Sequence, residues 1–443
     1  MKSILRRTFV IAFLFALGGS SVSFAAGNYL EVTYPGSKDT NELVLGVTYR
    51  LWIPEGVKTI RGVIVHQHGC GVGSNKGAVP GAKDLHWQAL AKKWDCALLV
   101  PSYHQAERDN CRLWCDPRNG SEKTFLRSLA DFAKQSGHAE LEKVLWCLWG
   151  HSGGGFWSSL MLTLHPERIA AIWFRSGSAF GAWEKGEIPK PQLTAAVYRV
   201  PLMFNGGVKE ESDPRHGPAR VNDRAMFNAW RAHGSPAGFA PDPRTGHECG
   251  DSRYLAIPFF DACLAMRLPA RAGQPLRPVD MKQAWFAGVL GDEAQPAARF
   301  AHDPKEAGWL PNERVAKAWA HYVKFGEVED TTPPPAPANL KAVAKSDGVE
   351  LTWDAEADFE SGLKAFIIQR DGQDLAQFPE KPQNKFGRPL FQNMSYGDTP
   401  VEPLPDFKFT DQSAKAGGRH EYRIVAVNSA GMKSKPSRTV SVR

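Results

Sequence analysis

The chain has 443 residues and lacks several features that would place it in common functional classes. Beyond the N-terminal segment, no apolar stretch is long enough to span a bilayer. The net charge is +7, yet no block of Lys and Arg resembles a nucleic-acid-binding face. There is also no Gly-rich phosphate loop and no H-E-x-x-H motif. These absences argue against a nucleic-acid partner and against a membrane-embedded domain in the mature chain.

Cysteine is scarce and confined to the first 263 residues. The seven cysteines are an odd number, so at least one thiol is expected to be free or paired between chains. Cys96 and Cys147 lie in apolar runs and are predicted to pack in the core. Without a Cys/His pair at zinc spacing, metal ligation by Cys111 and Cys115 has little support, and no metal is expected. The candidates for disulfide bonds are Cys70, Cys111, Cys115 and Cys249.

The first 25 residues have the pattern of a secretory signal peptide. Residues 1–7 are basic, residues 8–17 are apolar, and Ser23-Phe24-Ala25 is a small-x-small site with cleavage expected after Ala25. The alternative is an uncleaved membrane anchor, but the apolar run is short and is broken at residues 18–21. We expect a soluble mature chain that is secreted or periplasmic, with no membrane association after cleavage.

The next part of the chain alternates apolar runs with amphipathic helical segments. Residues 62–67, 96–101 and 143–149 are continuous apolar runs, and residues 43–53 alternate like an early antiparallel strand. This pattern predicts an α/β domain whose mostly parallel central sheet is covered by helices on both faces. Ligands in such sheets bind at the carboxyl ends of the strands.

The domain boundaries are predicted from changes in composition. The first domain is expected over residues 27–330, and its last part, residues 270–330, is an extension with a helix at 312–325. A Pro-rich linker follows at residues 331–337, and residues 338–443 form the second domain.

Short alternating strands in the second domain predict an all-β sandwich. The Pro-rich entry, Leu351-x-Trp353, and Tyr422-x-Ile424-x-Ala426-x-Asn428 followed by Gly431 make this region resemble a fibronectin type III domain. The resemblance implies that Trp353 and Tyr422 are core residues. Residues 373–411 are longer than the usual middle of such a domain, so we expect an inserted loop there.

A serine stands between an apolar run and a helical pattern in Gly150-His151-Ser152-Gly153-Gly154. A sharp turn between a strand and a helix exposes a serine hydroxyl, and flanking glycines tolerate the close packing of such a turn. The alternative role for Ser152 is an ordinary helix N-cap. Residues 43–268 resemble the α/β-hydrolase superfamily, in which the catalytic residues follow the chain order Ser, acid, His. The resemblance implies a fold of that type, with Ser152 as the nucleophile.

The resemblance further implies that His247 is the general base. It follows the last predicted strand, comes directly after a glycine, and precedes the closing helix. An imidazole can take the serine proton near neutral pH and return it to the leaving group. His216 and His233 lie in the same half of the chain, but in a predicted loop and at a helix end, and are less favoured.

The acid is expected in the loop after the apolar run at residues 201–205. Family members often place it three residues after a glycine, which selects Glu210. Asp213 and Glu211 follow in preference, and Glu184 is a distant fourth. The alternative for each is a solvated loop charge.

The oxyanion hole is expected to combine the backbone N–H of Gly153 with one from His66-Gln67-His68-Gly69-Cys70-Gly71. This loop resembles the His-Gly-rich oxyanion loop of lipases and esterases. Cys70 is the chosen second donor, with Gly69 as the alternative, and His68 is expected to be structural.

The substrate cleft is expected to include residues that follow the run at 96–101. Tyr103, His104 and the insertion at 110–119 lie at the same predicted sheet edge. Trp114 and Trp183 would stack on a sugar or aryl group, or else pack within a lid.

The sequence as a whole predicts a secreted serine hydrolase of carboxylic esters, acting through an acyl-enzyme and requiring no cofactor. Export and the second domain favour acyl esters on a polysaccharide, or a polyester, as substrate. A serine peptidase of the same fold and a catalytically inactive binding protein remain as alternatives.

Overall fold

The computed structural model describes residues 27–39, 41–289, 293–392, 396–400, 404–414 and 418–443. The expected signal peptide, residues 1–25, lies outside the described residues. In the part of the chain that is described, no helix is long and apolar enough to cross a membrane.

An eight-stranded sheet forms the centre of the first domain, in the order β1-β2-β4-β3-β5-β6-β7-β8. The expectation of a mostly parallel sheet is confirmed, because the neighbours from β4 to β8 all pair in parallel. The early antiparallel strand begins at Val47, and it pairs with a strand at 27–34 that the sequence pattern did not reveal. The strands are β1 (Gly27–Tyr34), β2 (Val47–Pro54), β3 (Gly62–Gln67), β4 (Cys96–Tyr103), β5 (Leu145–His151), β6 (Ile169–Arg175), β7 (Leu202–Gly207) and β8 (Ala237–Asp242).

Helices cover both faces of this sheet, as the continuous apolar strands require. Helices α2, α8 and α9 bury apolar side chains in one core, and α4, α5 and α7 bury theirs in the other. The helices are α1 (Val72–Ala78), α2 (Leu85–Lys93), α3 (Arg112–Cys115), α4 (Ser121–Ser136), α5 (Gly153–Leu164), α6 (Phe180–Glu184), α7 (Gly217–Ala232), α8 (Arg253–Arg267) and α9 (Glu313–Phe325).

The extension after α8 packs on the end of the large sheet. It holds a small antiparallel sheet of β10 (Gln295–Pro296), β9 (Trp285–Ala287) and β11 (Gly308–Leu310), which precedes α9. Trp319 Nε1 donates to Phe239 O at 2.8 Å, and the Tyr322 hydroxyl donates to Asp242 Oδ2 at 2.9 Å. The extension is therefore part of the first domain's core.

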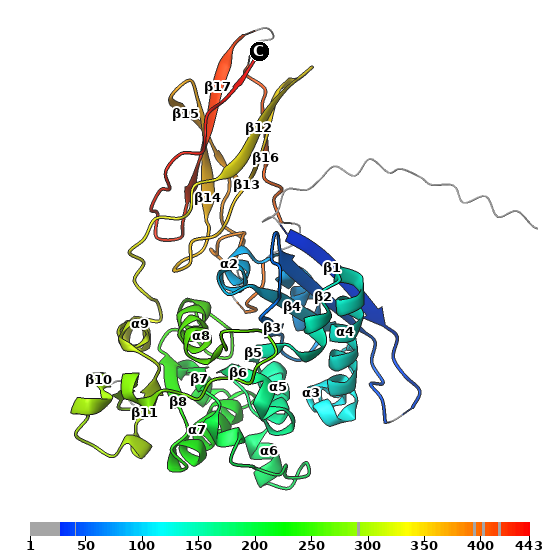
Figure 1. Ribbon diagram of the computed structural model, residues 1–443, viewed down its shortest axis with the longest axis vertical. Coiled ribbons are helices and arrows are strands. Elements are labelled where there is room, and N and C mark those ends of the chain that lie inside the picture. The colour runs from blue at the N-terminus through cyan, green and yellow to red at the C-terminus, as the bar shows by residue number, and fades with distance from the viewer. Residues whose placement is uncertain (1–26, 40, 290–292, 393–395, 401–403, 415–417) are drawn as a thin grey trace, which may run out of the picture.

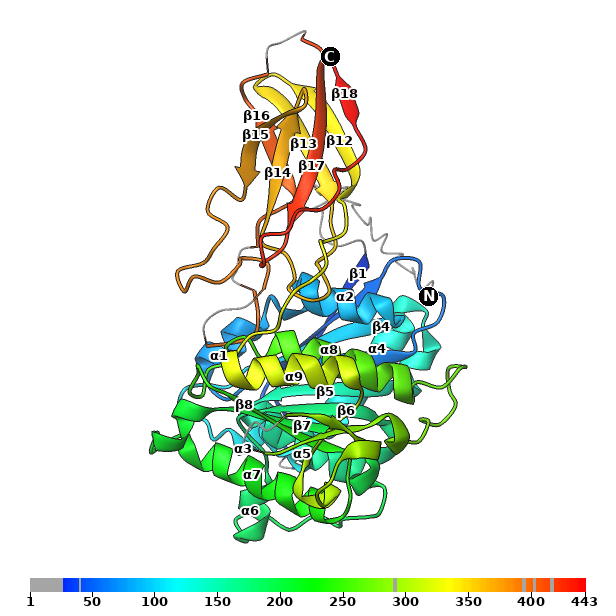
Figure 2. The same cartoon turned by 90° about the vertical axis from the view of Figure 1, so that its left-hand side faces the viewer.

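The second domain is all-β and consists of two antiparallel sheets, β12-β13-β16 and β15-β14-β17-β18. Trp353 and Tyr422 are buried between the sheets, as expected for core residues. Figures 1 and 2 show this domain standing beyond α2, with the C-terminus at its far end. The strands are β12 (Ala338–Lys345), β13 (Gly348–Asp354), β14 (Ala365–Arg370), β15 (Gln373–Phe378), β16 (Lys408–Asp411), β17 (His420–Val427) and β18 (Val440–Val442).

The expected insertion lies between β15 and β16, where residues 379–407 separate the two strands. This segment, which we call the inserted loop, turns toward the first domain and reaches the neighbourhood of α1 (Figure 2). Its Arg388 forms an ion pair with Asp251, and its Gln392 Oε1 accepts a hydrogen bond from the Tyr254 hydroxyl at 2.6 Å. The inserted loop thus fastens the second domain to the start of α8.

Candidate active site

Ser152 occupies a sharp turn between β5 and α5. Its backbone has φ 54° and ψ −113°, a region that a residue with a side chain adopts only at a cost of about 1–3 kcal/mol. Its N–H donates to Arg175 O at 2.8 Å, which fixes the turn against the end of β6. The serine therefore sits at the carboxyl edge of the sheet and at the N-terminal end of a 12-residue helix.

Glycines let this turn pack closely against its neighbours. A Cβ added at Gly150 would lie 2.4 Å from Gly154 O, and one added at Gly154 would lie 2.4 Å from Gln67 O. No side chain fits at either position, so the first turn of α5 sits directly on the ends of β3 and β5.

His247 and Glu210 lie in contact. Their Nδ1 and Oε1 atoms are 2.5 Å apart, and the Glu210 side chain is fully buried. The second carboxylate oxygen, Oε2, accepts a hydrogen bond from Ser176 Oγ at 2.8 Å. The carboxylate is thus held from both sides, and it can orient the imidazole of His247 through Nδ1.

The other acids considered from the sequence are engaged elsewhere. Asp213 Oδ2 lies 2.9 Å from His216 Nδ1, and Glu211 is exposed and pairs with Arg220 at 3.5 Å. Glu184 pairs with Lys190 at 2.7 Å. Of the four candidates, Glu210 is the one that the structure places against His247.

Burial governs the protonation of this pair. It raises the pKa of Glu210 to about 6, against the opposing effects of the Ser176 hydrogen bond and the Arg175 charge. It also lowers the pKa of His247 below its ordinary value, and the charges of His216 and Arg175 add to that shift. At neutral pH the imidazole is therefore neutral and the carboxyl group is ionised, the states that a general base and its orienting acid need.

Two further histidines, His151 and His216, lie next to His247, and the sequence did not predict that they contact it. His151 precedes Ser152, and its Nε2 lies 2.8 Å from His247 O, which ties the base to the serine turn. His216 stacks on the His247 ring with centroids 4.1 Å apart and an interplanar angle of 15°. Both contacts arise from residues far apart in sequence. His233, the other histidine weighed as a base, lies elsewhere: its ring stacks on that of Tyr198 with centroids 4.0 Å apart.

The loop that follows β3 lies against the serine turn. A Cβ on Gly69 would be 3.2 Å from Ser152 Cβ, and a Cβ on Gly153 would be 2.2 Å from Cys70 Sγ. Cys70 forms a disulfide with Cys111, which holds this loop to the insertion after β4. Both amides proposed for an oxyanion hole, and the alternative at Gly69, therefore belong to segments packed together at Ser152. His68 is buried with its Nδ1 close to Gly69 O, which fits the structural role expected for it.

A cleft of about 400 Å³ opens beside Ser152. Gly153, Phe156 and Asn222 are among its walls, and Arg112 and Glu187, which form an ion pair, lie in its lining. We call it the serine cleft. The insertion at 110–119 contributes to it, as the sequence suggested.

The aromatic residues proposed for the cleft belong to the core. Tyr103 and Trp114 are buried and stack at 4.5 Å, and Trp183 is 2% exposed. His104 bonds Thr48 at 3.0 Å, away from the serine. None of these four side chains is in the lining of the serine cleft, so the expectation that they line it is wrong. Tyr103, Trp114 and Trp183 are buried, whereas His104 is exposed; the alternative of packing within a covering segment describes Trp114 and Trp183.

The disulfide expectations hold in part. Cys115 and Cys249 are buried free thiols, so their assignment as disulfide candidates is wrong, while Cys96 and Cys147 are buried as expected. The sulfurs of Cys70, Cys111 and Cys115 lie within 4.8 Å of one another. Two of the three are already joined in the disulfide, so this group does not fit a metal ion.

Comparison with known proteins gives only distant likenesses. No family model and no curated protein matches the chain. Among solved structures, it is similar to poly(aspartic acid) hydrolase-1 from Sphingomonas sp. KT-1, with 15% identity, a TM-score of 0.36, and coverage of 51% of this chain and 94% of the other. A dienelactone hydrolase from Anabaena variabilis has 14% identity, a TM-score of 0.35, and coverage of 55% and 99%. An Fn3-like protein from Clostridium thermocellum has 21% identity, a TM-score of 0.16, and coverage of 25% and 94%. At such low scores, the chemistry of the site has to be argued from its own geometry.

Proposed function

We propose that the chain is a serine hydrolase of carboxylic esters. The observation that carries the proposal is the arrangement at one sheet edge: Ser152 on a strained strand-to-helix turn, and His247 oriented by a fully buried Glu210 at 2.5 Å. An ordinary N-cap serine needs neither a strained backbone nor a histidine–carboxylate pair beside it.

In the proposed mechanism, Ser152 Oγ attacks the ester carbonyl while His247 Nε2 takes its proton. Glu210 stabilises the imidazolium that forms. The N–H groups of Gly153 and Cys70, with Gly69 as the alternative to Cys70, stabilise the tetrahedral oxyanion, assisted by the N-terminal end of α5. His247 then protonates the departing alcohol, and water releases the acid from the acyl-enzyme by the same steps.

The proposed substrates are esters carried on a polysaccharide or its fragments, or a polyester. The serine cleft supports a polar, extended substrate, because the exposed side chains of Lys185 and Glu187 belong to its lining. Such groups can hydrogen-bond sugar hydroxyls or the polar backbone of a polymer.

We also propose that the protein works outside the cytoplasm. The Cys70–Cys111 disulfide supports this location, since such bonds persist in oxidising compartments. Intact-mass measurement of the exported chain should show the loss of residues 1–25, and an unprocessed mass in the cytosolic fraction would contradict the proposal.

The test of the chemistry is labelling with a fluorophosphonate probe alongside hydrolysis of ethyl acetate, for the wild type and Ser152→Ala. We expect both labelling and hydrolysis in the wild type and neither in the variant. Cleavage of a peptide amide without ester hydrolysis would favour the peptidase alternative. A wild-type chain that neither labels nor hydrolyses would favour the binding protein.

A further inference from the structure

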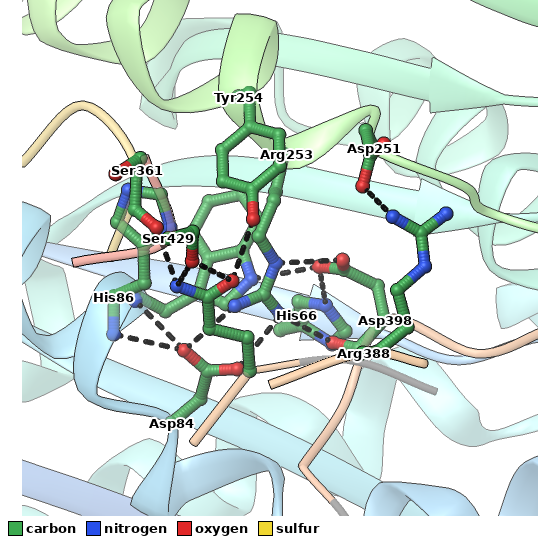
Figure 3. Close-up of polar contacts among 12 residues, drawn as sticks. His66, Asp84, His86, Asp251, Arg253, Tyr254, Ser361, Arg388, Asp398 and Ser429 are labelled. Carbon is green, nitrogen blue, oxygen red and sulfur yellow. Dashed lines mark hydrogen bonds and ion pairs between the residues drawn. The ribbon is translucent and has the colours of Figure 1, made fainter. Parts of the chain in front are cut away.

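The inserted loop of the second domain is anchored beside the candidate active site by a buried ion cluster. Asp398 Oδ1 accepts from Arg253 Nε at 2.8 Å, while Arg253 also holds Asp84 at 2.7 Å (Figure 3). All three side chains are fully buried. Asp398 Oδ2 lies 3.0 Å from His66 Nε2. Breaking such a cluster would leave a buried charge without its partner, which is costly, so Asp398 is held firmly in place.

The cluster also sets the protonation of its members. Burial alone would raise the pKa of Asp398, but the charge of Arg253 and the hydrogen bond from His66 outweigh it and hold the pKa well below its ordinary value. Asp398 is therefore ionised, and both of its oxygens already accept hydrogen bonds from the first domain.

Tyr396, two residues earlier, is brought to the catalytic histidine. Its carbonyl accepts a hydrogen bond from Cys249 N at 2.9 Å, two residues after His247. Its ring centroid lies 6.3 Å from that of His247 and 5.9 Å from that of His151. The side chain remains 47% exposed, so it is available to a ligand.

A second cavity, of about 350 Å³, lies between the inserted loop and the loop that follows β3. Tyr396 and Asp398 form one side of it, and Cys70 and Gly73 belong to the other. Cys70 also lines the serine cleft, so the two cavities adjoin at the proposed oxyanion loop. We call this second space the loop cavity.

The lining of the loop cavity favours an apolar occupant. It is mostly apolar and includes the indole of Trp149, on which His66 stacks at 4.1 Å. The carboxylate of Asp398 is occupied by its own partners. An aryl or branched alkyl group placed here would gain contact area against this lining.

We infer that the loop cavity binds an apolar arm of the ester substrate, with Tyr396 as a specificity-determining residue supplied by the second domain. The inference rests on the proposed function, since the arm belongs to an ester whose carbonyl lies at Ser152. Either the acyl group or the alcohol can supply the arm, because each extends from the same carbonyl carbon.

The test compares three esters by pH-stat titration of the released acid: ethyl acetate, benzyl acetate with the ring on the alcohol, and its isomer methyl phenylacetate with the ring on the acyl group. Gly73→Leu adds a bulky side chain at a position of the cavity lining, where a Cβ meets no atom within 4 Å. Tyr396→Ala removes the aromatic ring that forms part of one side of the loop cavity. Lys76→Leu, on the exposed side of the same helix, is the matched control.

We expect both variants to lower kcat/KM for one of the two ring esters by about tenfold or more, and to leave ethyl acetate within about twofold. The affected isomer identifies the side of the ester that enters the cavity, and Lys76→Leu should change neither. Equal loss for all three esters, or no loss for either ring ester, would overturn the inference while leaving the hydrolase intact. A wild-type chain that hydrolyses none of the esters would overturn the proposed function and the inference with it.

Discussion

Two histidine–carboxylate pairs are buried among the described residues, and their surroundings differ. His247 and Glu210 meet at 2.5 Å, and His66 and Asp398 meet at 3.0 Å. The His247 carbonyl contacts His151, the residue before the strained turn of Ser152, and Ser152 lines the serine cleft. Beside His66 stand Trp149 and Trp87, and the charge of Asp398 is shared with Arg253.

The difference between the two pairs is what surrounds the imidazole. In one pair, the carboxylate of Glu210 has Ser176 and His247 as its hydrogen-bond partners, and the proposed mechanism uses His247 Nε2 for the serine proton. In the other, the carboxylate neutralises a buried guanidinium and fastens one domain to the other. A histidine next to an acid is therefore no active site by itself, since His66 and Asp398 also line a cavity; the candidate nucleophile beside His247 makes the difference.

The largest effect is expected from replacing His247, the proposed general base. His247→Asn should lower kcat/KM for ethyl acetate by about 10⁵-fold, because the base is lost. His66→Asn should instead lower the melting temperature and keep kcat/KM within about tenfold. The measurements are initial rates and thermal unfolding for both variants. Equal rate losses in the two variants would remove the distinction between the pairs.

Replacing Glu210 and replacing Asp213, which lie in the same loop, should have different effects on kcat. Glu210→Gln keeps the shape but loses the charge that stabilises the imidazolium, and kcat should fall by about 10³- to 10⁴-fold. Asp213→Asn is the matched control in the same loop and should stay within about twofold. If Asp213→Asn proved the more damaging of the two, Glu210 would not be the acid.

On the structural side, Asp398→Asn should cost about 3–5 kcal/mol of stability, since Arg253 keeps only one of its two buried carboxylates. Glu356→Gln breaks the exposed interdomain ion pair with Lys92 and should cost less than about 1 kcal/mol. Denaturant unfolding measures both. A small effect at Asp398 would show that the cluster does not hold the domains together.

The smallest effect concerns a third buried carboxyl group, Asp223, which accepts a hydrogen bond from Gly177 N at 2.8 Å. Burial raises its pKa from 3.8 to about 8, with the Glu210 charge adding to the shift. Between pH 3.8 and about pH 8, Asp223 is therefore protonated in the folded state and ionised in the unfolded state. The stability of the folded state falls as the pH rises through this range.

Asp223→Asn removes this titration. Relative to the wild type, the variant should gain about 2–3 kcal/mol of stability between pH 6 and pH 9, because about two pH units of the window lie in that range. Unfolding at the two pH values measures the change, with Asp371→Asn, a replacement of an exposed carboxylate, as the control. Parallel pH profiles for Asp223→Asn and the wild type would mean that Asp223 is already ionised at pH 6.

Part of the candidate site could be predicted from the sequence. The apolar run before Ser152 and the glycines after it predict the turn, and the chain order picks out His247. Glu210 was one of four acids, and only the contact with His247 separates it from the neighbouring Asp213. His151 and His216 could not have been assigned, because their roles come from rings that meet only in the folded chain.

The sequence by itself determined the element types, because apolar periodicity along a strand or helix is a local property that burial enforces. Through the resemblance to a fibronectin type III domain, it also predicted the inserted loop and Trp353 and Tyr422 as core residues. Only the tertiary structure decided that this loop crosses to the other domain, where Asp398 meets Arg253 and Tyr396 meets His247. Those pairings join residues more than a hundred positions apart, and their energy depends on shared burial, which no local pattern records.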